Sequence, residues 1–326
     1  MTIDTFKPAP LLRNPHLQSI LASIGPRKLL VRRQARQLIA DAESQIIECS
    51  DGVRLQGELS CQPGNRKGLV FMIHGWEGSV DSLYLLSAGS RLYKNGYNIF
   101  RLNLRDHGAT QHLNPQLYNS TRLQEVLDAV TYAQGLFPAD DLFMAGFSLG
   151  GNFCLRVAAK APANAICLKQ VVAVCPVLNP LHTMQYLSEG WFVYHDHFVK
   201  SWQRSLKQKL KYYPELGYGD IMPKLRTLQA MNDYFVPNHT AYDDTVSYLL
   251  GYALIGDALE NLAVPCQLIT SMDDPMIHAK DLVDLAKSEQ LTIELTRYGG
   301  HCGYLENVNF ESWVDKRILA IFSAAQ

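Results

Sequence analysis

Ser148 lies in a Gly-x-Ser-x-Gly pattern at 146–150, between an apolar run at 142–145 and a stretch of helical periodicity at 149–159. Glycines on both sides of the serine allow a sharp turn from strand to helix. Such a turn exposes the hydroxyl at the N-terminus of the helix, near the positive end of its dipole. The same pentapeptide can arise by chance in a glycine-rich turn. The strand before it and the helix after it favour a nucleophilic serine.

A nucleophilic serine requires a base within hydrogen-bond reach, and that base requires an orienting carboxylate. His301 stands in a glycine-rich loop after a predicted strand at 292–297. Asp273 and Asp274 follow another predicted strand at 266–270. The order serine, acid, histidine is typical of one large group of hydrolases. Asp274 is the favoured acid because an Asp-x-apolar-apolar pattern begins there, whereas Asp273 is expected to cap the following turn.

A second glycine-containing turn, His-Gly-Trp-Glu-Gly at 74–78, follows the predicted strand at 69–73. Backbone N–H groups in such a turn can stabilise the oxyanion of an acyl-transfer reaction. We expect the N–H groups of Trp76 and Leu149 to form this oxyanion hole. His74 is expected to brace the turn and not to act as a base.

The elements that must position these residues alternate along the chain. Apolar runs predict buried strands at 69–73, 98–104, 142–145, 171–175, 266–270 and 292–297, and helical patterns separate most of them. Such alternation predicts crossover connections and a mostly parallel sheet with helices on both faces, an α/β fold. Asp-Gly at 51–52, between two stretches of period two, predicts a hairpin.

Two segments depart from this alternation. Residues 1–43 contain several prolines and are expected to form an irregular arm on the core. Residues 179–261 contain no convincing parallel strand and are expected to form a helical cap inserted into a core of 44–178 and 262–326. Aromatic residues are concentrated in this cap and are expected to line an acyl pocket: Tyr186, Trp191, Phe192, Tyr194, Tyr234, Phe235, Tyr242 and Tyr248.

Several motifs together resemble those of one family. They are Leu-Arg-Asn-Pro-His-Leu-Gln at 12–18, the turn at 74–79, the serine motif at 146–152, Asp-Asp-Pro at 273–275 and Gly-His-Cys-Gly-Tyr at 300–304. The chain resembles the YheT-like branch of the α/β-hydrolase superfamily. The resemblance implies a serine esterase or lipase-like hydrolase with Ser148, Asp274 and His301 as its catalytic triad. Some relatives act on monoacylglycerols or phospholipids, and fungal members transfer acyl groups to ethanol. Trp76 departs from the smaller apolar residue expected there, which would narrow the acyl pocket.

Three functions follow as hypotheses. The first is hydrolysis of short- to medium-chain acyl esters, monoacylglycerols among them, through an acyl-enzyme. The second is transfer of the acyl group to an alcohol, which the residues do not separate from hydrolysis. The third, from another class, is a binding protein that holds a small ligand without turnover, and the intact set of catalytic residues argues against it. A serine at position 148, where haloalkane and epoxide hydrolases use an aspartate, excludes those chemistries.

Composition sets further bounds. The formal net charge is −1 at pH 7, so nothing in it favours nucleic acid as a partner. Seven irregularly spaced cysteines argue against a disulfide framework and a zinc site, and no cofactor or metal is expected.

His195 and His197 are two residues apart in a helical stretch, so their side chains point to different faces, which argues against a metal site there. With neither a signal-peptide pattern nor a long apolar segment, a cytoplasmic location is expected. Transient contact with a lipid surface is compatible with the basic helix around Phe198, and the oligomeric state stays open.

Overall fold

A nine-stranded sheet forms the centre of the molecule in the computed structural model, which describes residues 2–3 and 6–326. The strand order is β1-β9-β8-β7-β6-β4-β5-β3-β2, and β3 pairs in antiparallel fashion with both β2 and β5, whereas the other pairs are parallel. This confirms the predicted α/β fold with a mostly parallel sheet. The strands are β1 (Thr2–Ile3), β2 (Ala42–Glu48), β3 (Arg54–Ser60), β4 (Leu69–Ile73), β5 (Asn98–Asn103), β6 (Leu142–Phe147), β7 (Leu168–Val174), β8 (Cys266–Ser271) and β9 (Leu291–Thr296).

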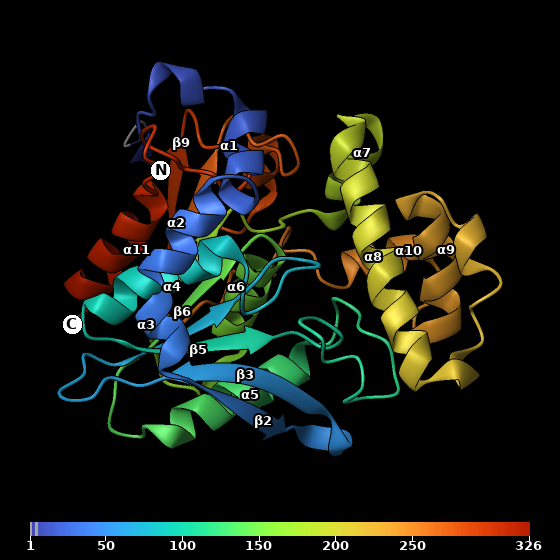
Figure 1. Cartoon of the computed structure of the whole chain (residues 1–326), viewed down its shortest axis with the longest axis horizontal. Helices are drawn as coiled ribbons and strands as arrows, with labels where there is room; N and C mark the ends of the chain where they lie inside the picture. The colour runs from blue at the N-terminus through green and yellow to red at the C-terminus, as the bar shows by residue number, and fades with distance from the viewer. Residues whose placement is uncertain (1, 4–5) are drawn as a thin grey trace.

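Helices cover both faces of the sheet (Figure 1). The alternate directions of the side chains along β4 show why. Leu69, Phe71 and Ile73 belong to a core shared with α5 (Leu123–Leu136) and α6 (Leu149–Lys160). Val70 and Met72 point the other way, into a core shared with α4 (Leu83–Lys94) and α11 (Trp313–Ala324). A strand buried on both faces is a continuous apolar run, as β4 is.

The N-terminal segment is largely helical, so the prediction of an irregular arm was wrong. It contains α1 (Pro15–Ser23), α2 (Arg27–Gln34) and α3 (Arg36–Ala40), which pack beside α4 (Figure 1). Pro10 and Pro15 begin helices and Pro26 directly precedes α2, positions at which a missing N–H does no harm. Pro15 opens α1, and the side chain of Asn14 accepts hydrogen bonds from the first turn.

Four helices lie between β7 and β8 and form the predicted helical insertion. They are α7 (Pro180–Glu189), α8 (Phe192–Tyr212), α9 (Leu228–His239) and α10 (Thr245–Leu250). Figure 1 places them together beyond one end of the strands, away from the helices that flank the sheet. The domain boundaries at 178 and 262 stay a prediction. Short 3-10 turns complete the chain at Pro10–Leu12, Ser50–Gly52, Pro162–Asn164, Pro214–Leu216, Met222–Lys224 and Ala279–Asp284.

A buried ion pair fastens this insertion, called the cap below, to the core. Nζ of Lys209 on α8 lies 2.7 Å from Oδ1 of Asp106, which follows β5, and the two side chains are 1 % and 8 % exposed. The other carboxylate oxygen of Asp106 accepts a hydrogen bond from the N–H of Tyr118. Asp106 thus shapes this part of the fold. Within the described ranges, no helix combines the length and apolar character needed to cross a membrane.

Candidate active site

Ser148 stands at the turn between β6 and α6 in a strained conformation. Its φ is 55° and its ψ is −120°, and its N–H donates to the carbonyl oxygen of Val174 at 2.9 Å. Flanking glycines make this turn sterically feasible. A Cβ on Gly146 would lie 2.3 Å from the carbonyl oxygen of Gly150, and a Cβ on Gly150 would lie 2.2 Å from that of Ile73. The predicted strand–turn–helix context of the serine is therefore present.

A continuous hydrogen-bond chain links Ser148, His301 and Asp274. Nε2 of His301 lies 2.9 Å from Oγ of Ser148, and Nδ1 of His301 lies 2.8 Å from Oδ2 of Asp274. The other oxygen of Asp274 accepts the N–H groups of Met276 and Ile277, which fixes the carboxylate. Three loops that follow separate strands thus bring together the three residues predicted from their order in the chain.

The histidine of this chain is electrostatically prepared to hold a proton. Burial disfavours the imidazolium, but the charge and hydrogen bond of Asp274 outweigh burial and raise the pKa of His301 above its ordinary value of 6.5. An imidazole oriented in this way can accept the proton of a serine hydroxyl and later return it to a leaving group.

Asp273 does not cap the turn that follows it, so that part of the sequence prediction was wrong. The turn is capped by Asp274, and Oδ1 of Asp273 instead accepts the N–H of Gly300 at 2.9 Å. Asp273 therefore holds the loop that carries His301. The sequence could not reveal this bond, because its partners lie 27 residues apart on two loops.

The turn at 74–78 packs directly against the serine. A Cβ on Gly75 would lie 3.1 Å from Cβ of Ser148. Within the described chain, the backbone N–H groups of Trp76 and Leu149 take part in none of the internal hydrogen bonds. His74 braces the turn as expected: its Nδ1 contacts the carbonyl oxygen of Gly75 and its Nε2 accepts the N–H of Leu104. Burial lowers the pKa of His74 to about 3, so this imidazole is neutral.

A cavity of about 80 Å³ opens above Ser148 and His301, between the core and the cap. The indole of Trp76 stacks on Phe198 with ring centroids 5.1 Å apart and meets Trp202 edge-on at 5.4 Å. The remaining walls are mostly apolar: Leu149, Val177, Pro180, Met184, Leu187, Leu249, Tyr252, Met276 and Ile277.

The cap aromatics named from the sequence mostly lie elsewhere. Of those eight, Tyr248 alone lines this cavity among the described residues. Trp191 and Phe192 are 42 % and 68 % exposed, and Tyr186 stacks on His278 outside the cavity. Helical phase explains the difference, because Phe198 and Trp202 are four residues apart on α8 and face the site together.

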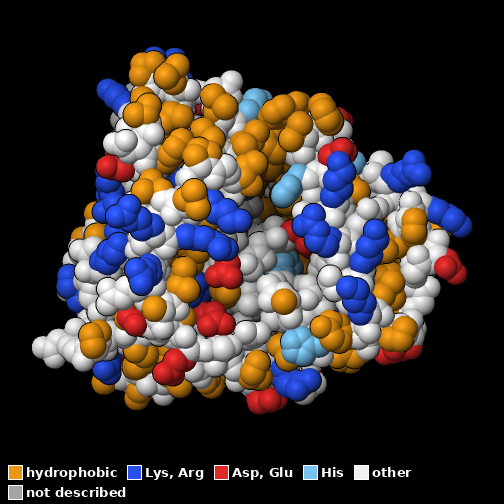
Figure 2. Space-filling view, viewed as in Figure 1, with side chains coloured by type: hydrophobic (Ala, Val, Ile, Leu, Met, Phe, Trp, Pro, Cys, Tyr) orange, Lys and Arg blue, Asp and Glu red, His pale blue; other side chains and the backbone are white. Residues whose placement is uncertain are grey.

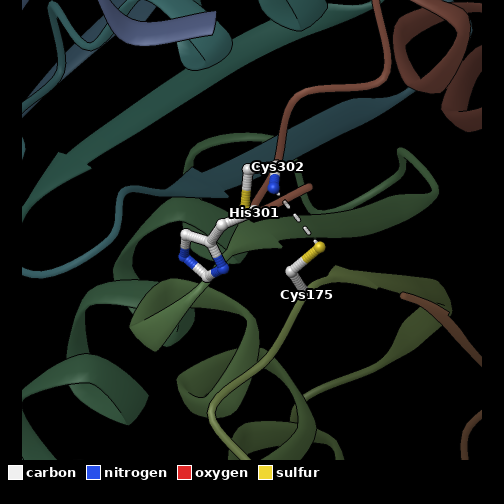
Figure 3. A group of neighbouring side chains, drawn as sticks. All are labelled: Cys175, His301 and Cys302. Atoms are coloured by element: carbon white, nitrogen blue, oxygen red, sulfur yellow. Dashed lines mark hydrogen bonds between the residues drawn. The ribbon is translucent and has the colours of Figure 1, made fainter. Parts of the chain in front are cut away.

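Two cysteines lie beside His301 (Figure 3). Cys175 follows β7, Cys302 is next to His301, and the N–H of Cys302 donates to Sγ of Cys175 at 3.4 Å. The two sulfur atoms and a ring nitrogen of His301 lie within 4.8 Å of one another. A metal bound there would compete for an imidazole already bonded to Asp274 and Ser148. Burial raises the pKa of the Cys302 thiol well above its ordinary value, which favours the protonated, non-ligating form.

Comparison with known proteins identifies the fold family. The family model described as the alpha/beta hydrolase fold matches residues 68–308. The chain belongs to this family. Monoacylglycerol lipase ABHD2 of Danio rerio is 26 % identical over 253 residues, and phospholipase ABHD3 of Bos taurus is 21 % identical over 257 residues. These alignments cover 71 % and 73 % of this chain but only 59 % of each relative, so the chain matches less than two thirds of their length.

Solved structures of other proteins share the fold at low sequence identity. Esterase Pf2001 of Pyrococcus furiosus has a TM-score of 0.57 at 15 % identity, with 87 % of this chain and 92 % of that chain covered. The 2,6-dihydroxy-pseudo-oxynicotine hydrolase has a TM-score of 0.61 at 15 % identity, with 91 % and 71 % covered.

Proposed function

We propose that the protein is a serine hydrolase that cleaves carboxylic esters, with Ser148 as nucleophile, His301 as general base and acid, and Asp274 as the orienting carboxylate. The observation that carries the proposal is the hydrogen-bond chain from Ser148 through His301 to Asp274. Relatives named as a monoacylglycerol lipase and a phospholipase support an ester substrate. The motifs of the YheT-like branch support the same reaction class.

The reaction proceeds through an acyl-enzyme. His301 takes the proton of the Ser148 hydroxyl, the serine oxygen attacks the ester carbonyl carbon, and the N–H groups of Trp76 and Leu149 bind the oxyanion. Collapse of the tetrahedral intermediate breaks the bond to the alcohol, which leaves with the proton from His301. Water, deprotonated by the same imidazole, then releases the acid and regenerates the serine.

The narrow cavity favours short- to medium-chain acyl groups. Trp76, Phe198 and Trp202 form a continuous aromatic wall beside Ser148 and leave limited space for a branched or bulky acid. Apolar walls with few polar groups suit the hydrocarbon part of an ester.

Two measurements test the function. The purified protein is incubated with a fluorophosphonate probe, and its hydrolysis of p-nitrophenyl esters of increasing acyl length is recorded. We expect labelling and turnover in the wild type and neither in Ser148→Ala. Ser205→Ala, a hydroxyl on α8, is the matched control. Wild-type protein that neither reacts with the probe nor hydrolyses any ester would favour a ligand-binding protein without turnover.

We also infer a transient contact with lipid surfaces in a cytoplasmic setting. Exposed Trp191 and Phe192 stand at the start of α8, and Lys and Arg side chains gather along this helix (Figure 2). Apolar side chains beside cations suit an anionic membrane surface. The protein should co-sediment with anionic phosphatidylserine vesicles and not with neutral phosphatidylcholine vesicles, and Phe192→Ser should weaken this binding. Equal binding to both vesicles, or to neither, would contradict the inference.

A further inference from the structure

Helix α1 packs against the loop that carries His301. The helix lies outside the residues matched by the family model. Two of its polar side chains are buried: Gln18 is fully buried and Ser19 is 6 % exposed. A buried polar side chain is retained at low energy only when its hydrogen bonds are satisfied. The partners of these two residues therefore indicate their role.

Ser19 holds the backbone of His301 itself. Oγ of Ser19 accepts the N–H of His301 at 2.8 Å and donates its own proton to the carbonyl oxygen of Pro15 at 2.7 Å. The second bond orients the hydroxyl so that a lone pair faces His301. The backbone position of the imidazole thus depends on a residue 282 positions away in the chain.

Gln18 clamps the end of the same loop. Its Oε1 accepts the N–H of Leu305 at 2.7 Å, and its Nε2 donates to the carbonyl oxygens of Leu305 and Leu12 at 3.0 and 2.7 Å. All three bonds are buried. The side chain therefore binds the loop and the chain before α1 at once.

Glycines let the loop approach the helix this closely. Gly300 has a φ of 53°, and a Cβ there would lie 2.4 Å from the carbonyl oxygen of Pro15. A Cβ on Gly303 would lie 2.8 Å from the carbonyl carbon of Gln18. The helix and the loop are in contact through backbone atoms, so movement of one requires movement of the other.

The same helix also contacts the cap. Nδ1 of His16 lies 2.9 Å from the hydroxyl of Tyr194 on α8, and the His16 ring lies 4.8 Å from that of Trp191. Helix α1 therefore bridges the cap and the His301 loop.

We propose that Ser19 and Gln18 are positioning residues for His301: they fix its loop so that the imidazole stays within reach of both Ser148 and Asp274. They touch neither substrate nor reacting atoms. The proposal rests on the catalytic role of His301 proposed above. Small displacements of a catalytic group reduce the rate strongly, whereas substrate binding in the cavity is little affected.

The test compares Ser19→Ala with Ser23→Ala, an exposed serine at the end of the same helix. For Ser19→Ala we expect kcat to fall about tenfold, the effect of one lost hydrogen bond, with KM unchanged and the circular dichroism spectrum preserved. Its pH profile should also show a displaced pKa for His301, whereas Ser23→Ala should match the wild type. Gln18→Leu, which removes three bonds, should lower kcat further.

Two results would overturn the proposal. One is a Ser19→Ala variant with wild-type kcat and pH profile. The other is a loss of activity that only follows the loss of folded protein, which would make Ser19 a purely structural residue. A wild type without esterase activity would reject the proposed function instead. In that case NMR titration of the His301 ring in wild type and Ser19→Ala still tests the positioning, because an unchanged pKa would contradict it.

Discussion

Asp273 and Asp274 are neighbours in the chain but hold different parts of the His301 loop: Asp274 bonds the imidazole, whereas Asp273 bonds the backbone N–H of Gly300. Asp274→Asn should lower kcat by about 10⁴, as in triads where the wrong histidine tautomer is favoured. Asp273→Asn should cost far less, because an amide oxygen can still accept the Gly300 N–H. Ester hydrolysis by both variants checks this. A larger loss of kcat in Asp273→Asn than in Asp274→Asn would show that Asp273, and not Asp274, orients His301.

The acidic limb of the pH profile should report His301. The base must be neutral to accept the serine proton, so kcat/KM should rise with pH through a pKa above 6.5, in keeping with the raised pKa of His301. Asp274→Asn removes the charge that raises this pKa, and its residual activity should titrate at lower pH. An acidic limb that stayed in place in Asp274→Asn would argue against His301 as the titrating group.

Stability should depend on pH through Glu77. Burial, with a smaller contribution from the charge of Asp106, raises the pKa of Glu77 from 4.5 to about 8 despite the opposing effect of Arg204. The folded state therefore binds this proton more tightly than the unfolded state, and the free energy of unfolding falls as pH rises from about 4.5 to about 8. Glu77→Gln cannot ionise, so its stability relative to wild type should increase across this interval. Urea unfolding at several pH values measures the difference, and a constant difference would contradict the prediction.

The ion pair between Lys209 and Asp106 should be costly to break on one side. Lys209→Met leaves a buried carboxylate without its cation and should lower the free energy of unfolding by about 3–5 kcal/mol. Asp106→Asn added to this variant removes the orphaned charge and should restore part of the loss. Lys207→Met, at an exposed position on the same helix, is the control. A double variant less stable than Lys209→Met would show that Asp106 acts chiefly through its other contacts.

The acyl-chain preference should depend on Trp76. Replacing it by alanine removes the stack on Phe198 beside Ser148 and should shift the best p-nitrophenyl ester to longer acyl chains. Trp191→Ala, which changes an exposed indole outside the cavity, should leave the profile unchanged. A Trp76→Ala variant that is folded and has the wild-type profile would mean that the aromatic wall only joins cap and core.

The centre of the sheet could be predicted because β4, β5, β6 and β8 are buried along their whole length. Apolar runs such as 69–73 coincide with β4, and the Asp-Gly at 51–52 lies in the turn between β2 and β3, both residues with positive φ. The two-residue β1 is too short to show any pattern. The prolines of residues 1–43 indicate an irregular segment, but Pro15 occupies the first turn of α1, where proline is compatible with a helix.

The site was predictable to the extent that its residues follow strands in order. Ser148, Asp274 and His301 each stand after a strand, so parallel pairing brings them to one edge of the sheet. Contacts of Gln18, Ser19 and Asp273 with the His301 loop depend instead on how distant segments pack, and no local pattern encodes them. The lining of the cavity was predicted poorly for the same reason, since composition cannot tell which helix face turns inward.

Left-handed backbone conformations recur around the site, at Ser148, Cys175, Cys302 and Tyr304 as well as at Gly300. Each such residue other than glycine adds about 1–3 kcal/mol of strain, which the surrounding cores must offset. Catalytic activity and folding stability are therefore opposed at these positions. Glycine at position 148 would relieve the backbone strain of the turn between β6 and α6 but would remove the nucleophile. Selection for thermal stability alone would replace these strained residues first. Stabilising substitutions are therefore better sought in the helices that cover the sheet, far from the site.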